Sequence, residues 1–232
     1  MFDFTAVNVE TTNNTRKNVC SICLIEYKNK TEVDRRHWMV KPDNYKFDKV
    51  AHYRHGIKED DLLDKPDLYD VWGEIVPYLD GKTLIAFPGN YTVECLIDSY
   101  NTRRLIREKE LRNNTLPVFE YICIHLLMHQ LFADINEPHI EGMCKNIGVK
   151  IDIFNEYSKT QALSDLLNHS INRFGFNNFH ELKKRADITI GERTNFLIHY
   201  YKNTVEIENL RQIMYCIPKH DRNPIKKASL HE

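Results

Sequence analysis

Two β-branched, apolar stretches near the start of the chain constrain its fold more than any other feature. Residues 4–10 read FTAVNVE and residues 19–27 read VCSICLIEY, and the polar segment between them contains Asn13-Asn14, a turn signal. A third such stretch, residues 36–40, ends at Lys41-Pro42-Asp43. Three strands joined by tight turns predict an antiparallel meander.

The rest of the pattern alternates helix and strand. Residues 58–80 carry apolar side chains at three-to-four spacing, which predicts a helix. Residues 84–86 then predict a fourth strand, parallel to the first if the helix is a crossover. Residues 91–191 are mainly helical in pattern, with a short edge strand at 149–151. These elements predict an α/β fold: a five-stranded mixed sheet with helices on both faces.

The domain organisation follows from where this pattern ends. Residues 1–191 form the predicted domain, and residues 192–232 are predicted to be a helical C-terminal extension that ends in a polar tail. The extension is also the segment most suited to holding a protein partner.

Composition excludes several classes of protein. The chain is 42% hydrophobic, which is enough for a hydrophobic core. Its net charge of −1 gives no overall positive potential that would attract nucleic acid. The start, MFDFTAVNVE, lacks the basic region of a signal peptide. No apolar run approaches the roughly 18 residues of a membrane span. We therefore expect a cytoplasmic protein without a membrane partner.

The cysteines do not predict a metal centre. Cys20 and Cys23 have the spacing of a zinc pair, but no second pair completes a four-ligand site. On a strand, residues three apart point to opposite faces, so both are expected to be core thiols. The same reading applies to the other four: Cys95, Cys123, Cys144 and Cys216.

Several segments resemble, in order, the motifs of the DnaQ-like (DEDDh) 3'-5' exonucleases, which have an RNase H-like fold and include the proofreading subunit of bacterial DNA polymerase III. VNVETT at 7–12 stands where that family has Asp-x-Glu-Thr. HGI at 55–57 resembles its His-Gly-Ile loop, and LIAFPGNYTVECL at 84–96 resembles its second motif. The segment 144–167 resembles the third, His-x4-Asp. The resemblance covers roughly residues 3–191.

The departures from the family fall on its chemistry. The resemblance implies two divalent metals held by three aspartates and a glutamate, with a histidine as general base. The five implied catalytic positions are occupied by Asn8, Glu10, Thr92, Asn155 and Thr160, and only Glu10 keeps its acid. Hard cations prefer anionic oxygen, and an amide cannot take a proton from water. We expect these residues to share one cleft, with no cofactor and at most one weakly bound Mg²⁺ or Mn²⁺ at Glu10.

Nearby acids offer a rearranged active site as an alternative. Glu94, Asp152 and Asp165 lie close to the substituted positions, but helical spacing directs Glu94 away from Thr92. His129 and Asp134 match His-x4-Asp literally, yet they precede the third motif. The inactive reading is therefore preferred.

Binding of nucleic acid could outlast catalysis. The resemblance places Thr11 and the loop His55-Gly56-Ile57 against a terminal nucleotide. A cluster of Arg103, Arg104 and Arg107 is either a solvated helix face or a local phosphate-binding patch.

Three functions follow from this pattern. The first is an inactive 3'-5' exonuclease homologue that binds single-stranded nucleic acid or its ends, or regulates a nucleic-acid-processing complex. The second is a protein-binding adapter or inhibitor built on the same fold. The third is an active metal-dependent exonuclease with unusual ligands. DNA and RNA both remain open as ligands.

Overall fold

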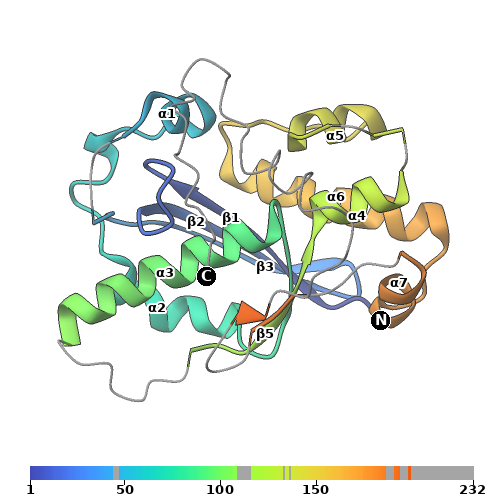
Figure 1. Cartoon of the computed structure of the whole chain (residues 1–232), viewed down its shortest axis with the longest axis horizontal. Coiled ribbons are helices and arrows are strands. Elements are labelled where there is room, and N and C mark those ends of the chain that lie inside the picture. The colour runs from blue at the N-terminus through green and yellow to red at the C-terminus, as the bar shows by residue number, and fades with distance from the viewer. Residues whose placement is uncertain are drawn as a thin grey trace, which may run out of the picture.

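The computed structural model describes residues 1–43, 47–108, 116–132, 134–135, 137–186, 191–193 and 198–199. Its strands are β1 (Phe4–Thr11), β2 (Val19–Lys28), β3 (Thr31–Met39), β4 (Thr83–Ala86), β5 (Phe119–Cys123), β6 (Gly191–Arg193) and β7 (Ile198–His199). They form one mixed sheet in the order β3-β2-β1-β4-β5-β6-β7 (Figure 1).

The first three strands form the predicted meander. β1 pairs antiparallel with β2, and β2 pairs antiparallel with β3. β4 lies on the other side of β1 and runs parallel to it, with Val7 opposite Ala86. The β1–β2 register shifts between Glu10 and Thr11, at the end of β1. The prediction of an antiparallel start followed by a parallel fourth strand is confirmed.

The fifth strand lies elsewhere than predicted. Residues 149–151 are not a strand; they follow Gly148, which ends a helix with φ 76°. β5 instead occupies residues 119–123, inside a run predicted to be helical, and pairs parallel with β4. The apolar run 118–132 contains both a short strand and the helix that follows it. Continuous apolarity hides this boundary because it has neither a period of 2 nor one of 3.6.

The helices are α1 (Lys49–His55), α2 (Leu68–Ile75), α3 (Gly89–Glu108), α4 (Ile124–Leu131), α5 (Ile140–Ile147), α6 (Glu156–Phe174) and α7 (Phe179–Arg185). The helix predicted over 58–80 is shorter than expected. Short 3₁₀ turns occupy Glu59–Asp61 and Val76–Tyr78, and α2 begins only at the capping box of Asp67 and Asp70.

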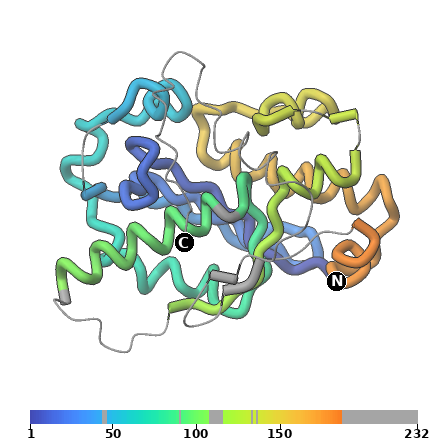
Figure 2. The backbone as a smooth tube through the Cα atoms, in the orientation of Figure 1, coloured from blue at the N-terminus to red at the C-terminus, as the bar shows by residue number. Residues whose placement is uncertain are grey.

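Helices cover both faces of the sheet, as predicted (Figures 1 and 2). Adjacent strand residues point to opposite faces. Val7 and Leu84 pack in one apolar cluster with residues of α2 and α3. Ala6 and Ile85 pack in a second cluster with residues of α4 to α7. The sheet is therefore the middle layer of three. No helix among the described residues has the length and apolarity needed to cross a bilayer.

The predicted C-terminal extension is only partly described. Residues 192–193 and 198–199, placed in a helical extension by the sequence pattern, are strand residues of β6 and β7. β6 pairs antiparallel with β5. The other residues of that extension lie outside the described residues.

Candidate active site

A buried lysine joins the first strand to the long helix α6. The Nζ of Lys159 lies 2.6 Å from Oε1 of Glu10 and 2.7 Å from Oε1 of Glu156. The Nδ2 of Asn8 donates a hydrogen bond of 2.7 Å to Oε2 of Glu156. The side chains of Lys159, Glu10 and Glu156 are 8%, 12% and 8% exposed. We call these four residues the lysine cluster; it places one ammonium between two carboxylates.

Local structure sets this arrangement. Asn155 caps α6, and its side chain accepts a hydrogen bond from the backbone N–H of Ser158. Helix residues three and four apart share a face, so Glu156 and Lys159 both face the sheet. Asn8 and Glu10 are two apart on β1 and therefore share a strand face. The two pairs meet where α6 crosses the end of β1.

The charges of the cluster compensate one another. Burial acts to lower the pKa of Lys159, but Glu10 and Glu156 together outweigh it and raise that pKa. Burial, and next the charge of Glu10, raises the pKa of Glu156, while Lys159 opposes the change. The ammonium is therefore firmly protonated and shared between two acids.

Two of the five predicted catalytic residues, Asn155 and Thr160, use their side chains to hydrogen-bond the backbone of α6. Thr160 is fully buried, and its hydroxyl donates a hydrogen bond of 2.7 Å to the carbonyl of Glu156. Asn155 is the helix cap. These side chains lie beside the lysine cluster but contribute neither a carboxylate nor a base.

Thr92 lies in the first turn of α3, which follows β4. Its hydroxyl donates to the carbonyl of Phe87 at 3.4 Å, so the contact described for it stays within its own turn. Burial raises the pKa of its neighbour Tyr91 to about 12.

The loop His55-Gly56-Ile57 is anchored to the same end of β1. Nδ1 of His55 accepts a hydrogen bond of 3.0 Å from the N–H of Ile57. Its Nε2 therefore carries the proton and donates to the carbonyl of Thr11 at 3.2 Å. Burial is the main cause that lowers the pKa of His55. Gly56, at φ 70°, ends α1, and a Cβ there would meet the Phe154 ring at 3.4 Å.

The arginine cluster on α3 has structural partners. Nε of Arg103 lies 2.8 Å from Asp43, and Nη2 of Arg107 lies 2.6 Å from Asp70. Arg104 is buried. These residues lie 11 to 15 positions beyond the first turn of α3, roughly 16 to 22 Å along the helix. The geometry favours a role in holding α3 to its neighbours over a phosphate-binding patch.

The acids considered as substitutes for lost ligands have other partners. Glu94 forms an ion pair with Arg16. Asp165 accepts from the side chain of Gln161, and Asp152 accepts from the backbone N–H of Phe154. Among the described residues, no group of three or more His, Cys, Asp or Glu side chains is arranged to hold a metal ion.

Sequence reasoning missed Glu156 and Lys159. Their signal was their helical spacing, since Glu156 lies one turn before Thr160 and Lys159 directly precedes it. The donor set does not fit two divalent ions. The two carboxylates already share a fixed ammonium, and the Asn8 amide donates to one of them rather than offering its oxygen.

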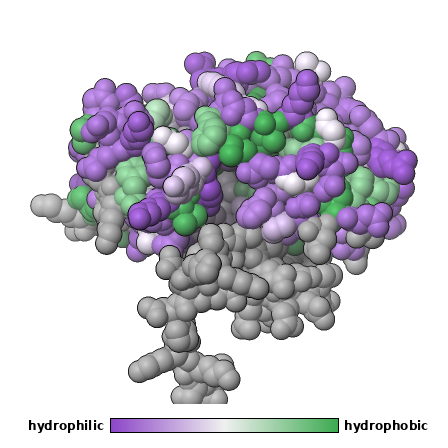
Figure 3. Space-filling view, turned by 90° about the horizontal axis from the view of Figure 1, so that it is seen from above, coloured by the Kyte–Doolittle hydropathy of each residue, from purple (hydrophilic) through white to green (hydrophobic). Residues whose placement is uncertain are grey.

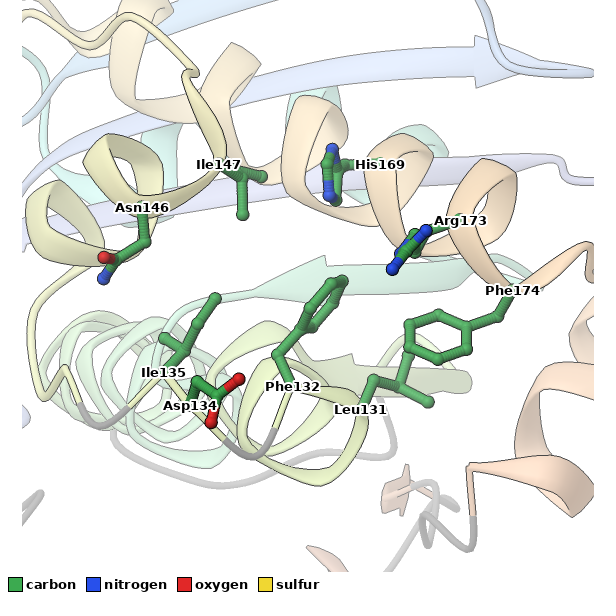
Figure 4. A pocket seen from close by; sticks show the side chains of 9 residues that line it. All are labelled: Leu131, Phe132, Asp134, Ile135, Asn146, Ile147, His169, Arg173 and Phe174. Carbon is green, nitrogen blue, oxygen red and sulfur yellow. The ribbon is translucent and has the colours of Figure 1, made fainter.

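A pocket of about 730 Å³ lies apart from the lysine cluster. Figure 4 shows its wall of Leu131, Phe132 and Phe174, with His169 and Arg173 of α6 across from Asp134. None of the five predicted catalytic residues lines it. This pocket and the predicted catalytic residues therefore lie in different places.

Comparison with known proteins gives similarity in structure alone. No protein-family model matches the chain, and no curated protein matches it. Exonuclease X, solved in complex with 5' overhanging duplex DNA, is 18% identical with a TM-score of 0.56, over 79% of this chain and 99% of that chain. A 3'-exonuclease solved for its 3'-end specific recognition of histone mRNA stem-loop is 10% identical with a TM-score of 0.57, over 88% and 92%.

Exonuclease I from Methylocaldum szegediense is 11% identical with a TM-score of 0.59, and the match covers 79% of this chain and 42% of that chain. This chain thus spans less than half of that longer exonuclease. At these identities the likeness concerns the fold, which agrees with the mixed sheet and the helices on both of its faces. The chain has the RNase H-like α/β fold of the DnaQ-like 3'-5' exonucleases.

Proposed function

We propose that this protein is a catalytically inactive member of the exonuclease fold that binds single-stranded nucleic acid or its ends. The observation that carries the proposal is Lys159, whose ammonium lies between Glu10 and Glu156. In a two-metal nuclease, that end of the sheet concentrates negative charge to hold divalent ions.

The charge of the lysine cluster is too small to hold two divalent ions. Two carboxylates and one ammonium carry a net charge of −1, against the four positive charges of two divalent ions. A divalent ion about 4 Å from the ammonium would be repelled by roughly 8 kcal/mol at an effective dielectric constant of 20. The ammonium offsets the charge of one acid, but it does not lower the pKa of a bound water as a metal does.

Neither Asn155 nor His55 is available as a general base. Asn155 uses its side-chain oxygen to cap α6. His55 has both ring nitrogens engaged, one with Ile57 and one with Thr11. Neither side chain is placed to take a proton from an attacking water.

A surface suited to a single strand lies beside the cluster. Phe154 is 63% exposed and stands next to Gly56, at the end of α1. On α1 itself Tyr53 is 77% exposed and is followed by Arg54. Figure 3 shows the face that carries α1 and α5, where hydrophobic side chains break a mainly hydrophilic surface. Exposed rings on which bases stack, next to cationic groups, are what sequence-tolerant single-strand binding needs.

The structural neighbours add indirect support. Exonuclease X was solved with overhanging duplex DNA, and the histone mRNA exonuclease recognises a 3' end of RNA. Both ligands expose single-stranded or terminal nucleotides. A protein that binds the same class of ligand but has lost the catalytic activity would have both the exposed rings and the lysine cluster.

Fluorescence anisotropy with short labelled strands of DNA and RNA, in the presence of Mg²⁺, tests the binding. We expect saturable binding, with the strand recovered at full length on a denaturing gel. Because stacking contributes about 1–3 kcal/mol per base, Phe154→Ala should weaken binding by about 5- to 150-fold. Leu126→Ala, which removes an exposed apolar side chain on α4, is the matched control.

Two results would count against the binding proposal. One is no anisotropy change with either nucleic acid, which would favour the alternative of a protein-binding scaffold. The other is an equal loss of affinity in Phe154→Ala and Leu126→Ala, which would place the ligand elsewhere.

A further inference from the structure

Two neighbouring histidines on α4 have buried ring nitrogens without hydrogen-bond partners among the described residues. His125 and His129 are four residues apart, and their ring centroids are 4.3 Å apart at an interplanar angle of 50°. His125 is 4% exposed. Both nitrogens of its ring, and Nε2 of His129, are buried and have no hydrogen-bond partner in the part of the chain that the structure describes. Three unpaired ring nitrogens therefore lie within one small region.

Such a group requires a physical reason. A buried polar group without a partner costs about 1–3 kcal/mol, and buried polar groups in native proteins are paired with protein, water or an ion. Besides His129, the ring of Phe87 packs on His125, at 5.3 Å between centroids, and it offers no hydrogen-bonding group. Cys123, at the start of α4, already accepts a hydrogen bond from the N–H of Gly89.

The two rings have the properties of metal ligands. Residues at i and i+4 of a helix share one face, which is the spacing at which a helix presents two imidazoles to a zinc ion. Burial, and next the neighbouring His129 and His139, lowers the pKa of His125 to about 4, so its ring is neutral at neutral pH. A neutral ring keeps the nitrogen lone pair that binds metal. The side chain of His129 is half-buried, and its Nε2 is buried.

We propose that His125 and His129 together bind one divalent transition-metal ion of the zinc class. Imidazole suits zinc, copper and nickel, whereas Mg²⁺ prefers oxygen ligands. No third ligand is in place among the described residues, so water fills the remaining positions. This site is on the α4 side of the sheet and uses none of the residues of the lysine cluster, so it stands independently of the proposed function.

Zinc titration of the untagged full chain, freed of metal by a chelator, tests the site by calorimetry. The wild-type chain should bind one Zn²⁺ that His129→Gln loses. Losing an outer-shell partner of a metal site typically costs about 10- to 100-fold in affinity, so losing a ligand should cost at least about tenfold. His180→Gln, an exposed histidine on α7, is the matched control and should bind as the wild type does.

The variants also distinguish the competing explanations. His129 is half-buried, so His129→Gln should fold even if His125→Gln does not, and circular dichroism checks this. A Co²⁺ spectrum that shows nitrogen ligation in the wild type and not in His129→Gln would support the site. Zinc affinity that is unchanged in His129→Gln, or no zinc binding by the wild type, would overturn it and leave a buried water as the partner of the rings.

Discussion

The Nζ of Lys159 on α6 lies 2.6 Å from Oε1 of Glu10 on β1, across 149 positions of sequence. With Glu156 as its second partner, this lysine takes a place that a metal ion takes in a nuclease of this fold: it offsets part of the charge of two buried acids. It does so permanently and without activating water. Several measurable consequences depend on this one contact.

Removal of the lysine should destabilise the fold. Lys159→Met leaves Glu10 and Glu156 buried without a counter-charge, and breaking a buried ion pair on one side costs about 3–5 kcal/mol. Urea unfolding at neutral pH measures the loss. Lys183→Met is the matched control, because its pair with Glu120 is far more exposed than the Lys159 pairs and should contribute less than about 1 kcal/mol.

The same experiment has an internal check. Adding Glu10→Gln and Glu156→Gln to Lys159→Met removes the uncompensated charges and should restore much of the lost free energy of unfolding. If Lys159→Met costs no more than Lys183→Met, the cluster is not the buried ion-pair network described above.

Acid should destabilise the protein through His125. Its folded-state pKa of about 4 is below its ordinary value of 6.5. Below pH 6.5 the unfolded chain therefore binds more protons, so stability falls as the pH drops from 6.5 toward 4. The difference corresponds to at most about 3 kcal/mol. His37 and His55, whose pKa values are also lowered by burial, act in the same direction.

Unfolding in chelator at a series of pH values from 7 to about 4 measures this dependence. The variant His125→Phe lacks the titrating ring and should show a shallower loss of stability over that range. An identical slope in the variant and the wild type would refute the assignment to His125.

The sequence predicted those parts of the fold in which a single short segment shows a clear strand or turn pattern. The strands β1, β2 and β4 have β-branched composition and clear turns at their ends, so their pairing could be inferred. β5 could not, because it runs directly into α4 within one apolar stretch. β6 and β7 are 3 and 2 residues long, too short to give a periodic signal.

Only part of the site could be predicted from the sequence. The order of the motifs pointed to Asn8 and Glu10, and the structure places both in the lysine cluster. The order of the motifs did not reveal Lys159, because a lysine in a helix is most often solvated, and only the three-dimensional meeting of α6 with β1 buries it. Likewise the arginine cluster of α3 left a solvated helix face and a phosphate-binding patch both open, because sequence alone does not show the acidic partners of Arg103 and Arg107.

Removal of the internal cation should create a metal site. Asn8→Asp combined with Lys159→Ala would bring three carboxylates together at the end of β1 without an ammonium between them. Because hard cations prefer anionic oxygen, this double variant should gain Mn²⁺ binding in electron paramagnetic resonance titrations. Asn8→Asp combined with Lys183→Ala keeps Lys159 and should not. Equal Mn²⁺ binding by the two double variants would mean that Lys159 does not block a metal.

Cleavage of a 5'-labelled single strand of DNA or RNA, followed over a long incubation with Mg²⁺ and with Mn²⁺, tests the central claim most directly. Loss of a general base alone typically costs about 10²- to 10⁴-fold, and loss of the metals removes the activated water as well. The purified protein should therefore leave both strands at full length, as should its Glu10→Gln variant. Metal-dependent shortening from the 3' end by the unmodified protein, lost in Glu10→Gln, would contradict the account.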